Sequence, residues 1–255
     1  MRELILNVEK KDNHFADYVY QKMLYPVKSS GGICAIDKYE DKICLGIAIS
    51  DESYQLIDNL FKSVVAEILA IGYKNKYLKQ NIGVDTSGLL GSVLLDTMCI
   101  FDSRYDAKYI KKQIKDFNVI SLIGCYNFRL IDIKQKWDDI IALFNSYGDF
   151  LTEESVIIEF LNYLLNAIPS LCKTITVIID DNLKNFELIN ENNVVLSKFE
   201  SFTTNNDVRE NLLFNLICYN PSLVNFCFDM DKLDEEFLLL LNQLFSVREL
   251  ILENN

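Results

Sequence analysis

Aspartates that follow β-like runs are the side chains of this sequence most able to carry chemistry. Asp180 and Asp181 come directly after one apolar run, and Asp229 and Asp231 follow another. If the two runs are parallel strands, their carboxyl ends share one edge of a sheet, where carboxylates can converge on Mg²⁺. One hypothesis is therefore a divergent Mg²⁺-dependent enzyme that uses Asp180, Asp181 and Asp229.

The same acids also suit a structural role, which we favour. Asp180-Asp181-Asn182 is typical of a hairpin turn, and Asp231 and Asp234 can cap a helix. An antiparallel hairpin would also direct the two groups of acids to different edges of the sheet.

Two other features that suggest catalysis lack essential residues. The segment 83–90 has the glycine spacing of a phosphate loop, but leucines stand where the phosphate-binding lysine and the Mg²⁺-binding hydroxyl are needed. His14 is the single histidine, and near the start of a predicted helix it is expected to be solvated or to cap. A Cys–His dyad with Cys34 or Cys44 stays open. We therefore predict no catalytic residue, no metal and no cofactor.

The cysteines indicate a reducing compartment. Most of the seven lie inside apolar runs, and no two form a Cys-x-x-Cys pair. This pattern is typical of reduced, buried thiols. The charged first residues do not resemble a signal peptide, and no apolar stretch is long enough to span a membrane. We expect a soluble, cytoplasmic protein. The cysteines are Cys34, Cys44, Cys99, Cys125, Cys172, Cys218 and Cys227.

The overall charge disfavours nucleic acid and anionic lipid as partners. The chain of 255 residues has a net charge of −12, which repels phosphate groups. Two basic stretches, residues 74–79 and 108–115, are best explained as solvated helix faces. Half of the residues are hydrophobic, so a large core can form, and only three prolines and nine glycines interrupt it.

The elements that would position these residues begin with a small α+β layer in residues 1–80. A strand over residues 3–8, a helix, a hairpin over residues 33–39 and 42–50, and a second helix follow in order. Ser50 is expected to cap the second helix, and two apolar quartets predict a wide buried stripe on it. The quartets are Leu56, Leu60, Val64, Ile68 and Ile57, Phe61, Val65, Leu69.

Residues 81–170 are expected to form a helical region that begins with a linker over residues 81–87. The apolar stripe of a helix over residues 130–144 contains Trp137, which predicts a core position for this side chain. Thr152 is expected to cap the next helix, which ends before Pro169.

Residues 171–255 are expected to form an α/β region with a partly parallel sheet and helices. A hairpin over residues 174–179 and 185–189 precedes a helix at 207–219, a strand at 223–228, a helix at 234–245 and a strand at 247–252. Alternation of strands and helices implies parallel pairing. The predicted fold class is thus mixed α/β (α+β), packed as one or two domains.

An arginine stands inside the apolar block 117–130 and interrupts it. An unpaired buried charge is strongly unfavourable, so Arg129 is predicted to be a structural pin that binds a carboxylate or backbone carbonyls. The block contains Gly124 and the sequence Phe128-Arg129-Leu130, and it continues into the helix with Trp137.

These residues resemble the central motif of the YtxC-like sporulation proteins, in which Gly-Phe-x-x-Phe-Arg-Leu opens a long amphipathic helix. Gly124, Phe128, Arg129 and Leu130 match that motif, and Cys125 stands where the first aromatic residue is usual. The order of elements extends the resemblance over residues 85–255, including the hairpin near residue 180, Asn220-Pro221 and the last strand.

The resemblance implies a role in endospore formation and a protein of unknown biochemical activity. It supplies no catalytic residues. The leading hypothesis is therefore a cytoplasmic, sporulation-associated interaction protein with an unknown protein partner. The Mg²⁺-dependent enzyme is the alternative. A factor associated with a lipid surface or the spore coat is a third hypothesis, which the acidic charge disfavours.

Overall fold

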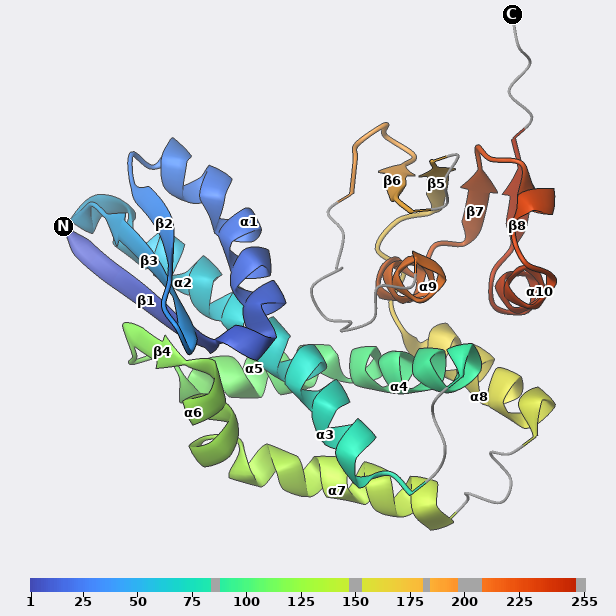
Figure 1. Ribbon diagram of the computed structural model, residues 1–255, viewed down its shortest axis with the longest axis horizontal. Coiled ribbons are helices and arrows are strands. Elements are labelled where there is room, and N and C mark those ends of the chain that lie inside the picture. The colour runs from blue at the N-terminus through green and yellow to red at the C-terminus, as the bar shows by residue number, and fades with distance from the viewer. Residues whose placement is uncertain (84–87, 147–152, 181–183, 197–207, 251–255) are drawn as a thin grey trace, which may run out of the picture. The chain divides into compact units, whose positions relative to one another are not determined.

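The protein is mixed α/β, as predicted, and forms two compact units. The computed structural model describes residues 1–83, 88–146, 153–180, 184–196 and 208–250 (Figure 1). The first unit comprises residues 1–82 and 102–143, and the second comprises residues 83–101 and 144–255. Residues 81–170, predicted as one helical region, therefore contribute to both units. Thr152, Asp181 and residues 84–87 of the glycine segment lie outside the described residues.

The first unit is built on a four-stranded sheet with the order β2-β3-β1-β4. Strand β3 pairs antiparallel with both β1 and β2, and β4 pairs parallel with β1. Because β3 lies between β1 and β2, the segment β1–α1–β2 is a split β–α–β unit. Its strands are β1 (Arg2–Glu9), β2 (Ile33–Lys38), β3 (Lys42–Ile49) and β4 (Val119–Ser121).

Helices of the first unit cover one face of this sheet. Alternate residues of β1 and β3 are buried, including Leu4, Leu6 and Leu45, and α1 contacts all three long strands. A period of two places these side chains on one face. The helices are α1 (Asn13–Ser29), α2 (Asp51–Ile68), α3 (Lys74–Asn81), α5 (Ser103–Gln113), α6 (Leu122–Phe128) and α7 (Ile131–Ser146), whose last three residues belong to the second unit.

Two details of α2 differ from the prediction. Ser50 occupies the N-cap position, but its side chain makes no capping hydrogen bond. Leu56 is 69% exposed and Leu60 is only partly buried, so the buried stripe follows the other quartet, which begins at the fully buried Ile57. The end of the helix is also unusual, because residues 69–73 form a π-helix between α2 and α3.

The second unit contains the predicted partly parallel sheet, with the order β6-β5-β7-β8. Strands β5, β7 and β8 are parallel, and β6 returns antiparallel to β5 as a hairpin. Helix α4 packs against α8 and α9, and α8 also contacts α10. The elements are α4 (Leu89–Phe101), α8 (Glu154–Ala167), β5 (Thr174–Ile179), β6 (Phe186–Asn190), α9 (Val208–Tyr219), β7 (Leu223–Phe226), α10 (Glu235–Leu244) and β8 (Val247–Glu249).

Candidate functional site

The parallel strands place two of the predicted acids at the same edge of the second sheet. Val177 of β5 pairs with Phe226 of β7, so Asp180 and Asp229 each follow their paired residues by three positions. The expectation that the acids lie at different edges is wrong, because Asp180 ends a strand that is parallel to β7. The strand directions therefore satisfy one requirement of the enzyme hypothesis.

The side chain of Asp180 nevertheless closes the hairpin. Its carboxylate accepts hydrogen bonds from the backbone N–H groups of Lys184 (2.7 Å) and Asn185 (3.1 Å) and from the Asn185 amide (3.2 Å). The two backbone hydrogen bonds are the main cause that lowers the pKa of Asp180. Asp234 caps α10, because its carboxylate accepts a hydrogen bond from the Phe237 N–H. Both structural roles were predicted, and the described residues contain no cluster of metal-ligating side chains.

The environment of His14 differs from the prediction of a solvated or capping residue. The ring is partly buried, and Nε2 has no hydrogen-bond partner among the described residues. Burial is the main cause that lowers the pKa of His14, and the nearby Lys76 acts in the same direction. A neutral imidazole against the core is thus the form that the fold favours.

The residues of the family-like motif separate into exposed and buried positions. The Gly124 N–H donates a hydrogen bond to Ser121 Oγ at the start of α6, while Leu130 is buried. Phe128 is 75% exposed and Arg129 is exposed beside it. The prediction that Arg129 is a buried pin is wrong. Its guanidinium lies 5.1 Å from the centre of the Phe117 ring instead.

Trp137 is a core residue, as predicted, and its environment contains a buried ion pair. Its side chain is fully buried, and Nε1 donates a hydrogen bond to Asp106 Oδ2 over 2.9 Å. The ammonium of Lys74, which is also fully buried, forms ion pairs with Asp102 and Asp106. Burial is the main cause that raises the pKa of Asp106, and Lys74 opposes this shift.

A second group of charges lies beside the π-helix of residues 69–73, which ends at Tyr73. The hydroxyl of Tyr73 donates to Asp12 Oδ2 over 3.2 Å, and the Lys76 ammonium forms an ion pair with Asp12. Stretch 74–79 is therefore not the solvated face that the sequence predicts, because Lys74 and Asn75 are buried and Lys76 is largely covered. The carboxylates of both groups bind lysine, tyrosine or tryptophan side chains. We therefore assign them to the stability of the fold and not to ligand binding.

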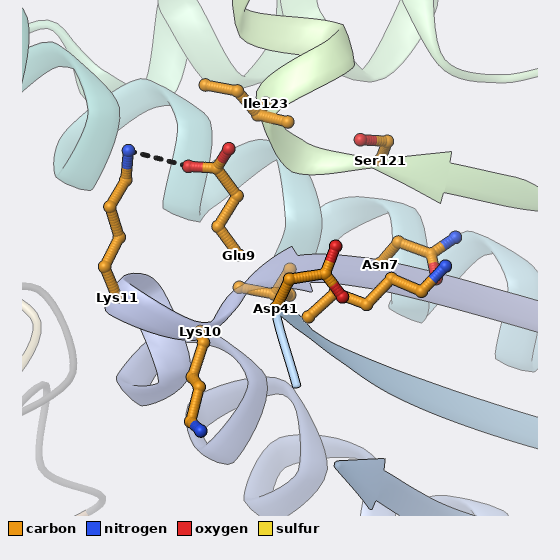
Figure 2. A pocket seen from close by; sticks show the side chains of 9 residues that line it. Asn7, Glu9, Lys10, Lys11, Asp41, Ser121 and Ile123 are labelled. Atoms are coloured by element: carbon orange, nitrogen blue, oxygen red, sulfur yellow. Dashed lines mark ion pairs between the residues drawn. The ribbon is translucent and has the colours of Figure 1, made fainter. Parts of the chain in front are cut away.

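A pocket of about 480 Å³ opens at the carboxyl ends of the parallel strands β1 and β4 (Figure 2). Figure 2 shows Asn7 and Asp41 on one side of it and Ser121 and Ile123 on the other. Glu9 and Lys11 form an ion pair over 2.8 Å at its rim. No sequence motif marked this pocket, because its residues come from three separate chain segments. The lining consists of Asn7, Val8, Glu9, Lys10, Lys11, Asp41, Lys42, Ser121 and Ile123.

The uncovered face of the first sheet carries one apolar row between rows that contain polar residues, whereas an exposed sheet face is usually polar throughout. Register places Ala35, Gly46, Ile5 and Val119 in one row across all four strands. Ala35 is exposed, Val119 is 57% exposed, and a Cβ built on Gly46 meets no atom of the described chain within 4 Å. We call this row, with the adjacent Ile33 and Ala48, the open face.

The seven thiols fit the predicted burial in part, since four are buried and three are partly exposed, and none of these seven described cysteines forms a disulfide. None of the helices among the described residues has the length and apolarity of a membrane span. Comparison with family models, curated proteins and solved structures finds no match for this chain.

Proposed function

We propose that this chain is a non-catalytic interaction protein of the sporulating cell that binds a partner protein on the open face. The apolar row across the first sheet is the observation that carries the proposal. The resemblance of Gly124 and residues 128–130 to the sporulation motif supports the cellular setting. The structural use of the buried carboxylates and of Asp180 supports a role without catalysis.

Small side chains make the open face suitable for close packing. Gly46 and Ala48 lie at its centre, and the larger Ile33 and Val119 stand on either side. A partner that covers these residues would remove exposed apolar surface from water, which stabilises a complex by roughly 25 cal/mol per Å² of apolar area. Exposed apolar patches of this kind mark interaction sites.

Charge favours a basic partner over a second copy of the chain. Glu3 and Asp37 are exposed at outward-facing positions beside the apolar row. The whole chain also has a net charge of −12, so two copies repel each other. The proposed occupant is therefore an apolar segment of another protein with basic residues on its flanks.

Gly46→Arg is expected to weaken partner binding by at least about tenfold, because it places a bulky cation in the centre of the face. The space around Gly46 should keep the melting temperature close to that of the wild type. Tyr105→Arg, at a position that is 77% exposed on α5, is the matched control and should bind normally. The measurement is quantitative pull-down from sporulating cells, followed by titration of the captured protein at two salt concentrations.

Equal retention of the partner by wild type and Gly46→Arg would contradict the use of this face. Sedimentation of the purified chain tests whether a second copy of the chain, and not another protein, covers the open face. A stable dimer that Gly46→Arg dissociates would show that a second copy covers the face, and the proposed basic partner would be wrong.

The Mg²⁺-dependent enzyme remains a second candidate because β5 and β7 are parallel and bring Asp180 and Asp229 to one edge. We expect Mg²⁺, Mn²⁺, ATP and GTP to leave the melting temperature unchanged, since the Asp180 carboxylate already binds three hydrogen-bond donors. A specific ligand would raise it through preferential binding to the native state. A rise with Mg²⁺ that Asp181→Asn or Asp229→Asn abolishes would instead support the enzyme.

A further inference from the structure

Strand β2 forms a long, unprotected edge of the first sheet. It is a terminal strand in the order β2-β3-β1-β4, and its six residues contain neither a proline nor a bulge. The other terminal strands of the described sheets are shorter or partly covered, since β4 and β8 have three residues each and Val195 bridges to β6. Natural sheets usually shorten, cover or charge their edges, because an exposed edge pairs with other chains. Among the described strands, β2 is therefore the one best suited to accept a further strand.

The alternation of hydrogen bonds identifies the backbone groups of β2 that point outward. The Tyr39 N–H donates a hydrogen bond to the Lys42 carbonyl over 2.9 Å, so this pair is of the hydrogen-bonded kind. Opposite residues of an antiparallel pair alternate between the hydrogen-bonded and the non-hydrogen-bonded kind, so every second residue before Tyr39 binds β3. On the other side of β3, the Lys10 N–H donates to the Asp41 carbonyl, which agrees with this alternation. The residues whose N–H and C=O groups point away from the sheet are Cys34, Ile36 and Lys38.

Side-chain burial agrees with an uncovered edge. Cys34 and Ile36 lie on the helix-covered face of the sheet, because they pair with Ile47 and Leu45 of β3. Both residues of β3 are buried, whereas Cys34 and Ile36 are partly exposed. The described part of the chain thus leaves the outer side of β2 accessible to solvent.

We propose that β2 binds an extended segment of another protein as an added, fifth strand of the first sheet. The outward N–H and C=O groups of Cys34, Ile36 and Lys38 pair with the backbone of this segment. Such strand addition gives affinity through the main chain, and alternate side chains of the segment give specificity. The added strand lies beside Ala35, so it extends the apolar row of the open face by one position.

The chemistry of β2 selects an uncharged segment with basic ends. Residues 33–36 carry no charge, so apolar and β-branched side chains of the segment make favourable cross-strand pairs with them. The exposed Asp37 follows directly and attracts a basic residue at the end of the segment. The net charge of −12 also attracts a basic segment and repels a second copy of this chain.

The experiment is fluorescence anisotropy of a labelled synthetic peptide, in which valine and threonine alternate between terminal arginines, titrated with the full chain. We expect saturable binding, and hydrogen exchange of the Cys34, Ile36 and Lys38 amides should slow in the complex. Lys38→Pro should weaken binding by at least about tenfold, because proline removes one outward N–H and places its ring at the edge. Lys38→Thr is the matched control, since it removes the same charge and keeps the N–H, and it should bind at least as tightly as the wild type.

The variants are expected to fold, because the side chain of Lys38 is exposed and its N–H does not bind β3. Melting curves check this expectation. N-methylation of two consecutive peptide residues blocks both edges of the peptide and should abolish binding.

Four results would overturn the assignment. They are the absence of peptide binding up to the solubility limit, equal affinities of Lys38→Pro and Lys38→Thr, undiminished binding of the N-methylated peptide, and a dimer of the purified chain that Lys38→Pro dissociates. The last result would show that a second copy occupies the edge. Gly46→Arg should still bind the peptide, because Gly46 lies on β3 and not at the edge. Failure of the partner proposal for the open face and failure of this inference can therefore be told apart.

Discussion

Lys74→Met is expected to lower the free energy of unfolding by about 3–5 kcal/mol, the usual cost of removing one partner of a buried ion pair. Lys74 is fully buried and forms ion pairs with Asp102 and Asp106. Without it, the carboxylate of Asp106 would remain in the core with the Trp137 N–H as its donor. Chemical denaturation, monitored by circular dichroism, measures the loss.

The cost of Lys74→Met should also depend on pH. Burial raises the pKa of Asp106, and Lys74 opposes that shift, so the variant should raise this pKa further. A raised pKa favours the fold while the acid is protonated, and this contribution is lost as the pH rises through the folded-state value. The variant should therefore be less destabilised at pH 5 than at pH 8.

Lys108→Met is the matched control for this measurement. Lys108 is exposed on α5, two residues after Asp106, and its replacement should change the stability by no more than about 0.5 kcal/mol. Equal effects of the two substitutions, at either pH, would show that Lys74 is not held in a buried ion pair.

Trp137→Ala is expected to cost about 3–5 kcal/mol, as other large aromatic truncations in protein cores do. The side chain has no exposed surface, and it packs beside Tyr77 with ring centres 5.6 Å apart. Trp137→Phe should cost less, because the phenyl ring still fills most of the space, although the hydrogen bond to Asp106 and part of the packing are lost. Urea denaturation of the three proteins measures both differences.

Fluorescence of the wild type provides an independent check, because Trp137 is the only tryptophan of the chain. The emission should be blue-shifted and poorly quenched by iodide. A red-shifted emission that iodide quenches fully would contradict the buried position. The Trp137→Phe and Lys74→Met substitutions should not be additive, since both remove partners of the same carboxylate.

The parts of the fold that depend on local patterns could be predicted from the sequence. The alternation of Leu4, Leu6 and Val8 determines which face of β1 is buried, and Asp234 stands where a helix cap is needed. The strand–helix alternation after residue 171 implied the parallel pairs of β5, β7 and β8. These features follow from a period of two, a capping side chain and a short crossover, all of which are visible in one stretch of sequence.

Features that depend on distant residues could not be predicted in this way. The stretch from Lys74 resembles a solvated helix face, because the acids that bind Lys74 are 28 and 32 residues away in the chain. The π-helix before it also changes the phase of the helix, since it inserts an extra residue into the turn. Arg129 illustrates the opposite error, because apolar neighbours in sequence did not bury a residue at the end of α6.

The open face and the pocket were missed for related reasons. Gly46 and Ala48 suggest only a weak strand in the sequence, and their importance depends on which residues pair with them across β1 and β2. The pocket unites residues near positions 9, 41 and 121, which no local motif connects.

The interleaved order of the two units has a consequence for the synthesis of the protein. The chain passes from one unit to the other after residues 82, 101 and 143, so the first unit, which needs β4, Asp106 and Trp137, is complete only after residue 143 has left the ribosome. The 13-residue helix α4, most of which is buried in the finished protein, emerges long before its packing partners α8 and α9. Domains generally fold during translation as soon as they are complete, and exposed apolar segments aggregate in the meantime. The nascent chain is therefore expected to need a chaperone between residues 101 and 219, and no fragment that ends at residue 82 should fold alone.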